Sequence, residues 1–168
     1  MFSPSGMLLL IDFGGGGHSL TGDLHYRAPE ELQRDSWPAH KGSDIYALGA
    51  VLYEMLTLSA PYSFCEEEGF DPASVRQAIL AGAPPAPSSL SAEIPPSLEA
   101  CITKAMARDP EDRYSDAAAF ARDLSRFLSG EATPAAREKR AIEATRTAPT
   151  FRLPHRLLAA SVLLMMTA

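Results

Sequence analysis

The stretch from Ser43 to Leu58 (SDIYALGAVLYEMLTL) constrains the fold more than any other part of the chain. Its larger apolar side chains recur at helical spacing, and small or aromatic residues fill most of the remaining positions. The apolar positions are Ile45, Leu48, Val51, Leu52, Met55 and Leu56. A helix without a polar face lies inside a sizeable domain or inside a membrane, and the charges of Asp44 and Glu54 favour the domain. We therefore expect a buried central helix whose start is capped by Ser43 and Asp44.

Composition indicates one globular domain followed by a tail. The chain has 168 residues, of which 46% are hydrophobic. Before residue 129 it has nine Lys and Arg against eighteen Asp and Glu, whereas residues 129–156 have six against three. The acidic body argues against sequence-independent binding of nucleic acid, which relies on basic residues. The two cysteines and four histidines show no metal-binding spacing, so no metal site is assigned to them.

The rest of the chain predicts one short strand and several helices. Residues 7–11 (MLLLI) are a continuous apolar run typical of a buried strand, and the glycines at 14–17 begin a loop that extends to Tyr26. Cap residues, prolines and apolar periodicity predict the helices. These are expected at residues 28–32, 71–81, 96–107 and 115–130.

The C-terminal part differs in composition from the body. Residues 131–149 are rich in Ala, Thr and charge with little apolar periodicity, which indicates a linker with at most a frayed helix. Residues 157–168 carry no charge and follow Arg152 and Arg156, a pattern that predicts the start of a membrane span. The alternative is an apolar tail that docks on a core, because twelve residues are fewer than the roughly 20 that a spanning helix needs.

Four short motifs occur in a definite order. They are Asp12-Phe13-Gly14 after the apolar run, YRAPE at 26–30, SDIYALG at 43–49 and DPEDRYS at 109–115. Together they resemble the C-terminal lobe of a eukaryotic-like protein kinase. The residues of these motifs are similar to those of bacterial serine/threonine kinases. The resemblance implies a mainly α fold, the helical kinase C-lobe, with a short β-strand before the DFG motif. The chain would then hold an incomplete α+β kinase fold.

The resemblance assigns ATP and magnesium to the first motif. Asp12, Phe13 and Gly14 would form the cofactor-binding residues of the complete domain, with Asp12 as the ligand of Mg²⁺. A carboxylate at a glycine-flanked strand end suits this task, because Mg²⁺ prefers hard oxygen ligands and bridges the nucleotide phosphates. Phe13 would pack and set the direction of the aspartate.

The resemblance gives the other motif residues supporting roles. Glu30 and Arg113 match a pair that forms a bidentate ion pair in the family and fixes the activation segment to the helical lobe. Asp44 would accept backbone N–H bonds from the catalytic loop. Asp23 and Tyr26 lie in the loop implied to dock the substrate, although Asp23 stands where these kinases usually have threonine.

Several family motifs are not found in these 168 residues. They are the glycine-rich loop over ATP, the strand lysine with its helix glutamate, and the HRD loop with the catalytic aspartate and a metal-binding asparagine. The glycines at 14–17 do not replace them, since no Lys-Ser/Thr follows. The expectation is therefore part of a serine/threonine kinase that transfers the γ-phosphoryl group of ATP to protein hydroxyls, with the chain alone inactive. The alternatives are a catalytically dead interaction module and a nonfunctional gene fragment.

These inferences predict three segments. Residues 1–128 would be a partial kinase domain, 129–156 a basic juxtamembrane linker, and 157–168 the start of a transmembrane helix. The expected partner is a protein substrate, with no nucleic acid. The expected location is the cytoplasmic side of the inner membrane, anchored by a single span, and the resemblance also allows a dimer in the full-length form.

Overall fold

A computed structural model describes residues 24–33, 41–66 and 71–147. The chain divides into two compact units, residues 1–136 and 137–168, which we describe separately. In the described residues every regular element is a helix and none is a strand. This confirms the mainly α prediction for the parts that the structure covers. The predicted strand at 7–11 and the glycines at 14–17 lie outside the described residues.

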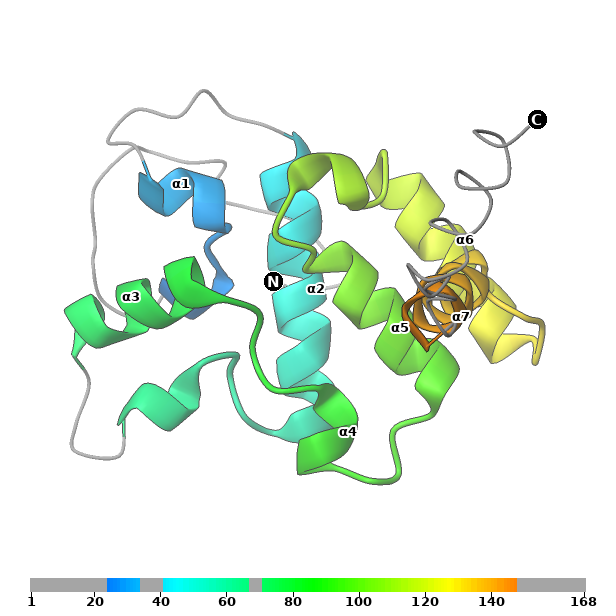
Figure 1. Cartoon of the computed structure of the whole chain (residues 1–168), viewed down its shortest axis with the longest axis horizontal. Helices are drawn as coiled ribbons and strands as arrows, with labels where there is room; N and C mark the ends of the chain where they lie inside the picture. Colours follow the sequence, from blue (N-terminus) through cyan, green and yellow to red (C-terminus); the bar gives the residue numbers. More distant parts are fainter. Residues whose placement is uncertain (1–23, 34–40, 67–70, 148–168) are drawn as a thin grey trace, which may run out of the picture. The chain divides into compact units, whose positions relative to one another are not determined.

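Helix α2 (Lys41–Thr57) is the central element of the first unit. In Figure 1 it stands beside α5 (Pro96–Ala105), its most extensive helical neighbour, and α6 (Ala117–Leu128) packs on α5. The other elements of this unit are short. They are η1 (Leu24–Tyr26), α1 (Pro29–Gln33), η2 (Ser63–Glu66), α3 (Pro72–Ala81), α4 (Pro87–Leu90) and η3 (Pro110–Asp112). Segments η1 and α4 contact α2, whereas α1 and α3 pack against each other.

Local cap signals place two of these helices where the sequence predicted them. Asp71 accepts the backbone N–H groups of Ala73 and Ser74 at the start of α3. Asp116 accepts the N–H of Ala119 at 2.7 Å at the start of α6. Both caps satisfy amides that have no partner within the helix.

Two predicted helix ends require correction. Helix α5 ends at Ala105 rather than Ala107, because Met106 takes non-helical backbone angles (φ −94°, ψ 18°) and the N–H of Ala107 bonds the carbonyl of Lys104. Helix α2 begins at Lys41, so Ser43 and Asp44 lie within its first turn and the prediction that they cap it was wrong.

Three clusters of buried apolar residues form the core of the first unit. One joins α2, α5 and α6 and includes Ile45, Ala100, Cys101, Ala105, Tyr114, Phe120 and Ala135. A second joins α2 and α5 to the start of α1 and includes Ala28, Tyr46, Ala50, Tyr53, Ile102 and Met106. A third lies around α3 and includes Leu24, Leu32, Tyr62, Val75 and Ile79. Helix α2 contributes to the first two, which makes it the shared wall of the core.

The prediction that α2 is buried all round was wrong. Leu48, Val51 and Met55 have 43%, 44% and 69% of their surface exposed, and Asp44 is also exposed. These residues follow one another at steps of three or four and therefore form a single stripe along the helix. Apolar periodicity identifies the apolar positions of the helix. It does not show whether another segment covers their side chains. We call these four residues the open face of α2.

Helices α2 and α5 approach most closely at Gly49. A Cβ atom placed on Gly49 would lie 2.8 Å from the Cβ of Ala105 and 2.9 Å from the Cγ of Met106. Both distances are shorter than ordinary carbon contacts, and the Cβ of Ala105 is fixed to its helix. The absence of a side chain at position 49 therefore sets how closely the two helices pack.

We expect Gly49→Ala to lower the free energy of unfolding by about 1–2 kcal/mol. Overpacking of this kind costs roughly 1–3 kcal/mol, and the better helix propensity of alanine returns up to about 1 kcal/mol. Urea unfolding followed by circular dichroism measures the change. Adding Ala105→Gly removes the contact with the fixed Cβ of Ala105, although that with Met106 remains, so the double variant should lose less than the sum of the two single losses. Simple additivity would contradict the proposed contact.

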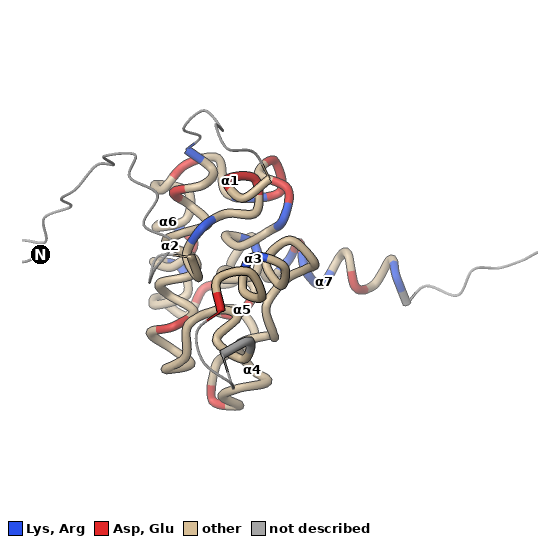
Figure 2. Tube along the Cα trace, turned by 90° about the vertical axis from the view of Figure 1, so that its left-hand side faces the viewer, with Lys and Arg blue, Asp and Glu red and all other residues tan. Residues whose placement is uncertain are grey.

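The second unit is described from Arg137 to Thr147, which is the larger part of α7 (Pro134–Thr147). This segment was expected to be a linker with at most a frayed helix, and the structure shows a helix of 14 residues. Figure 2 shows both signs of charge along α7. Its basic residues are Arg137, Lys139, Arg140 and Arg146, and its acidic residues are Glu138 and Glu143.

Candidate functional site

The candidate site is built around a buried ion pair between Glu30 and Arg113. Glu30 lies in the first turn of α1, and Arg113 follows η3, 83 positions further along the chain. Two parallel bonds join them, Nη1 to Oε1 and Nη2 to Oε2, each of 2.7 Å. Both residues are at most 5% exposed. The predicted bidentate pair therefore forms, and it ties α1 to the turn that precedes α6.

Arg113 also holds three backbone carbonyls together. Its Nη1 donates to the carbonyl of Gly42 at 2.8 Å and its Nε to that of Ala107 at 2.7 Å. Its Nη2 donates to the carbonyl of Arg108 at 3.2 Å. The guanidinium lies 5.1 Å from the ring centre of Tyr46. All five N–H groups of the side chain thus have acceptors. These bonds offset the desolvation cost of burying the charge.

Ser43 adds a third member that the sequence did not reveal. Its hydroxyl donates to Oε1 of Glu30 at 2.9 Å, and the side chain is buried. The sequence predicts Ser43 as a cap of α2, because serine before an apolar run is a common cap signal. Only the position of α1 next to the start of α2 assigns Ser43 to Glu30, and no local pattern encodes that proximity.

The surroundings of Glu30 lower its pKa. Burial by itself raises the pKa of the carboxyl group, but the bonds from Arg113, from backbone and from Ser43 favour the charged form and outweigh it. Glu30 therefore stabilises the fold as a carboxylate.

We expect acid to weaken the fold partly through Glu30. A carboxyl group whose pKa is lower in the folded state adds stability above its unfolded pKa of about 4.3, and this stability is lost as the pH falls through the folded value. The free energy of unfolding should therefore decrease below about pH 5. Urea unfolding between pH 7 and pH 3 should show a smaller decrease for Glu30→Gln than for the natural chain. The exposed Glu93→Gln is the control for loss of a charge, and an equal decrease in all three proteins would contradict this role of Glu30.

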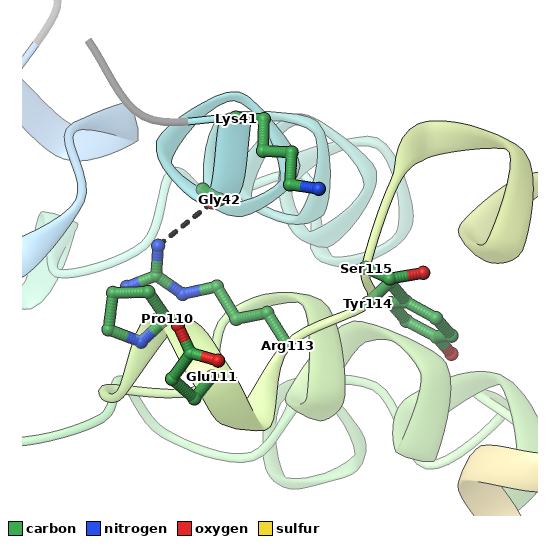
Figure 3. A pocket seen from close by; sticks show the side chains of 7 residues that line it. All are labelled: Lys41, Gly42, Pro110, Glu111, Arg113, Tyr114 and Ser115. Carbon is green, nitrogen blue, oxygen red and sulfur yellow. Dashed lines mark hydrogen bonds between the residues drawn. The ribbon is translucent and has the colours of Figure 1, made fainter.

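A small pocket lies beside the ion pair. It has a volume of about 210 Å³ and is lined by Lys41, Gly42, Pro110, Glu111, Arg113, Tyr114 and Ser115. Figure 3 shows the guanidinium of Arg113 turned toward Gly42, whereas the amine of Lys41 points away from this guanidinium. Pockets that hold small molecules usually measure roughly 300–1,000 Å³. This pocket is smaller, and we assign no ligand to it.

Segment η1, ahead of α1, is a short helix where the sequence predicted a loop, and it is anchored to α2 and to the chain beyond α2. The hydroxyl of Tyr26 donates to Oε2 of Glu54 at 2.6 Å, and Nδ1 of His25 lies 2.7 Å from the carbonyl oxygen of Pro61. The sequence predicts no role for His25, since an isolated histidine carries no local signal. Tyr26 therefore has a defined place beside the C-terminal half of α2, whereas Asp23 lies outside the described residues.

The predicted cofactor residues lie outside the part of the chain that the structure describes. These are Asp12, Phe13 and Gly14. Within residues 24–33, 41–66 and 71–147, no group of three or more His, Cys, Asp or Glu is placed to hold a metal ion. Asp44, expected to receive bonds from a catalytic loop, is exposed at one end of the open face of α2.

Comparison with known protein families accounts for this arrangement. The family described as "Protein kinase domain" matches residues 1–124, which is about three quarters of the chain. The chain belongs to the protein kinase domain family. The match contains the buried pair, the central helix and most of α6, so these features belong to the helical lobe of a kinase domain.

Curated relatives are bacterial serine/threonine kinases. The chain is 35% identical over 143 residues to serine/threonine-protein kinase PknB of Mycobacterium tuberculosis (strain ATCC 25618 / H37Rv), an alignment covering 78% of this chain and 22% of the relative. It is 40% identical over 114 residues to PknD of Chlamydia pneumoniae, covering 66% of this chain and 11% of the relative. The chain therefore spans about a fifth or less of the length of these kinases.

The described residues show no membrane-crossing helix. None of their helices combines the length and apolar character that a span requires. Residues 157–168, where a span was predicted to begin, lie outside the described part.

Proposed function

We propose that this chain is part of a serine/threonine protein kinase that transfers the γ-phosphoryl group of ATP to hydroxyls of a protein substrate. Family membership and the bacterial kinase relatives support this reaction class. In the complete kinase domain, these 168 residues would supply the helical lobe. On its own it would be inactive, because the catalytic base and the lysine that positions the phosphates are not in this sequence.

The observation that carries the proposal is the contrast between the two sides of α2. One side is packed against α5 and, through Arg113 and Ser43, connected to Glu30. The other side is the open face, an apolar stripe with Asp44 at one end. An exposed apolar stripe on an otherwise packed helix is typical of a surface that another segment covers. In the proposed kinase that segment is the catalytic loop, whose backbone N–H groups would bond Asp44.

Asp12, Phe13 and Gly14 would bind the cofactor in the complete domain. The carboxylate of Asp12 offers the hard oxygen ligand that Mg²⁺ prefers, so the donor chemistry fits this ion. Magnesium bound there would neutralise charge on the ATP phosphates. Tyr26 and Asp23 would contribute to the docking of the protein substrate, Tyr26 from the position that its bond to Glu54 defines.

The location of the full-length kinase is part of the same proposal. The apolar residues 157–168 after Arg152 and Arg156 support a cytoplasmic domain anchored to the inner membrane by one span. The full-length form would also be able to dimerise. Neither point is needed for the proposed reaction.

A fusion experiment tests the reaction. The part of the kinase domain that precedes the aligned region in PknB of M. tuberculosis is joined to the N-terminus of this chain, and transfer of labelled phosphate from ATP-Mg to a basic protein substrate is measured. The fusion should transfer phosphate, and Asp12→Asn in the fusion should abolish transfer. A folded fusion without activity would contradict the proposal and favour a non-catalytic interaction module.

A further inference from the structure

Asp123 occupies an unusual position for a charged residue. It lies in α6, is 2% exposed and makes its hydrogen bonds inside the first unit. Its Oδ2 accepts the hydroxyl of Tyr114 at 3.0 Å and the backbone N–H of Ala135 at 3.1 Å. Its Oδ1 lies 3.5 Å from the guanidinium of Arg126, a longer contact at the surface. The carboxylate thus connects the turn before α6, α6 itself and the first turn of α7.

The bond to Ala135 satisfies an amide that α7 cannot satisfy. The first N–H groups of a helix have no acceptor within it, and Ala135 is the second residue of α7. Thr133 satisfies the next amide of the helix, because its Oγ1 accepts the N–H of Ala136 at 3.2 Å. Thr133 is fully buried and Ala135 is 3% exposed. The first turn of α7 is therefore packed into the same core as α6.

The surroundings of Asp123 strengthen these bonds. Ala135 packs in one apolar cluster with Cys101, Tyr114 and Phe120, and the rings of Tyr114 and Phe120 lie 5.1 Å apart. Burial raises the pKa of the Tyr114 phenol, which therefore remains a hydrogen-bond donor. Hydrogen bonds to a charged group contribute more than neutral ones, and a low-dielectric site strengthens them further.

We propose that Asp123 is a latch that makes residues 133–136 part of the helical lobe and fixes the point at which the chain beyond Ala136 leaves it. Loss of the carboxylate releases this segment while the lobe stays folded. The composition supports a boundary here, because residues 1–136 have nine Lys and Arg against nineteen Asp and Glu, whereas residues 137–156 have six against two. In the full-length kinase the latch determines where the segment after the lobe starts to move independently.

Hydrogen exchange of the natural chain, measured residue by residue by NMR, tests the latch without any substitution. Among the described residues the acceptor of the Ala135 N–H is Oδ2 of Asp123, so the exchange of this amide reports the latch. We expect Ala135 to exchange as slowly as amides inside α6, and at least tenfold more slowly than Ala144 near the end of α7. Exchange of Ala135 as fast as that of Ala144 would overturn the proposal.

Variants of α6 provide the second test. In Asp123→Ala the amides of residues 133–147 should exchange at least tenfold faster, while those of α2 and α5 remain unchanged. Asp123→Asn keeps an oxygen acceptor and should lie closer to the natural chain. Arg126→Ala, on the same helix, leaves both bonds of Oδ2 intact and should not change the exchange of Ala135. Equal acceleration throughout the lobe, or none in Asp123→Ala, would overturn the latch.

Discussion

Replacing Arg113 with methionine lowers the free energy of unfolding by about 3–5 kcal/mol, because Glu30 is left as a buried charge without a partner. The loss is large because the pair is bidentate and Arg113 also serves three backbone carbonyls. Urea unfolding followed by circular dichroism measures it. Arg122→Met, an exposed arginine on α6, is the control and should change stability by less than about 0.5 kcal/mol.

A second substitution separates the ion pair from simple loss of packing. In the double variant Glu30→Leu with Arg113→Met no buried charge remains, so part of the lost stability should return. The recovery is incomplete, because the carbonyls of Gly42 and Ala107 still lack their donor. A cost below about 1 kcal/mol for Arg113→Met alone would show that Glu30 reaches water or another cation when Arg113 is removed.

Replacing Ile102 with alanine lowers the free energy of unfolding by about 2–5 kcal/mol, since it removes a fully buried side chain and leaves a cavity. Ile102 is 1% exposed and packs with Tyr46 and Tyr53 of α2. Met55→Ala is the matched comparison, because Met55 lies on the open face of α2 and is 69% exposed. Its loss should cost less than about 1 kcal/mol.

This comparison also tests the two-sided character of α2. Both variants shorten a large apolar side chain to alanine, and they differ in the side of α2 that loses its contacts. Thermal unfolding gives an independent measure, with a larger decrease in Tm for Ile102→Ala. Equal losses for the two variants would mean that the open face is covered in solution.

Local signals explain why some elements could be predicted from the sequence. Asp71 before Pro72 and Asp116 before an apolar stripe mark the starts of α3 and α6, and Gly130, with a φ of 73°, follows the end of α6. A cap and its amides lie within three residues of each other, so the pattern contains the whole interaction. Helix α7 was missed as a stable helix because its apolar residues are few.

Interactions between distant segments could not be predicted in this way. Glu30 and Arg113 were paired through the family resemblance, since nothing in the residues between them indicates that they meet. The sequence predicts neither the bond of Ser43 to Glu30 nor that of Asp123 to Ala135, because each depends on packing that local patterns do not encode. The open face of α2 shows the same limit, because apolar periodicity does not identify what covers a side chain.

The central claim, that these residues hold the helical lobe of a kinase but not its catalytic machinery, is tested most directly by phosphoryl transfer from the pure chain. The 168-residue protein is incubated with labelled ATP and Mg²⁺, alone and with a basic protein substrate, and incorporated phosphate is counted. The Asp12→Asn variant provides the blank. We expect no incorporation above this blank, since the HRD motif that would carry the catalytic base is not found in these 168 residues. Incorporation approaching one phosphate per chain, absent in Asp12→Asn, would contradict the account.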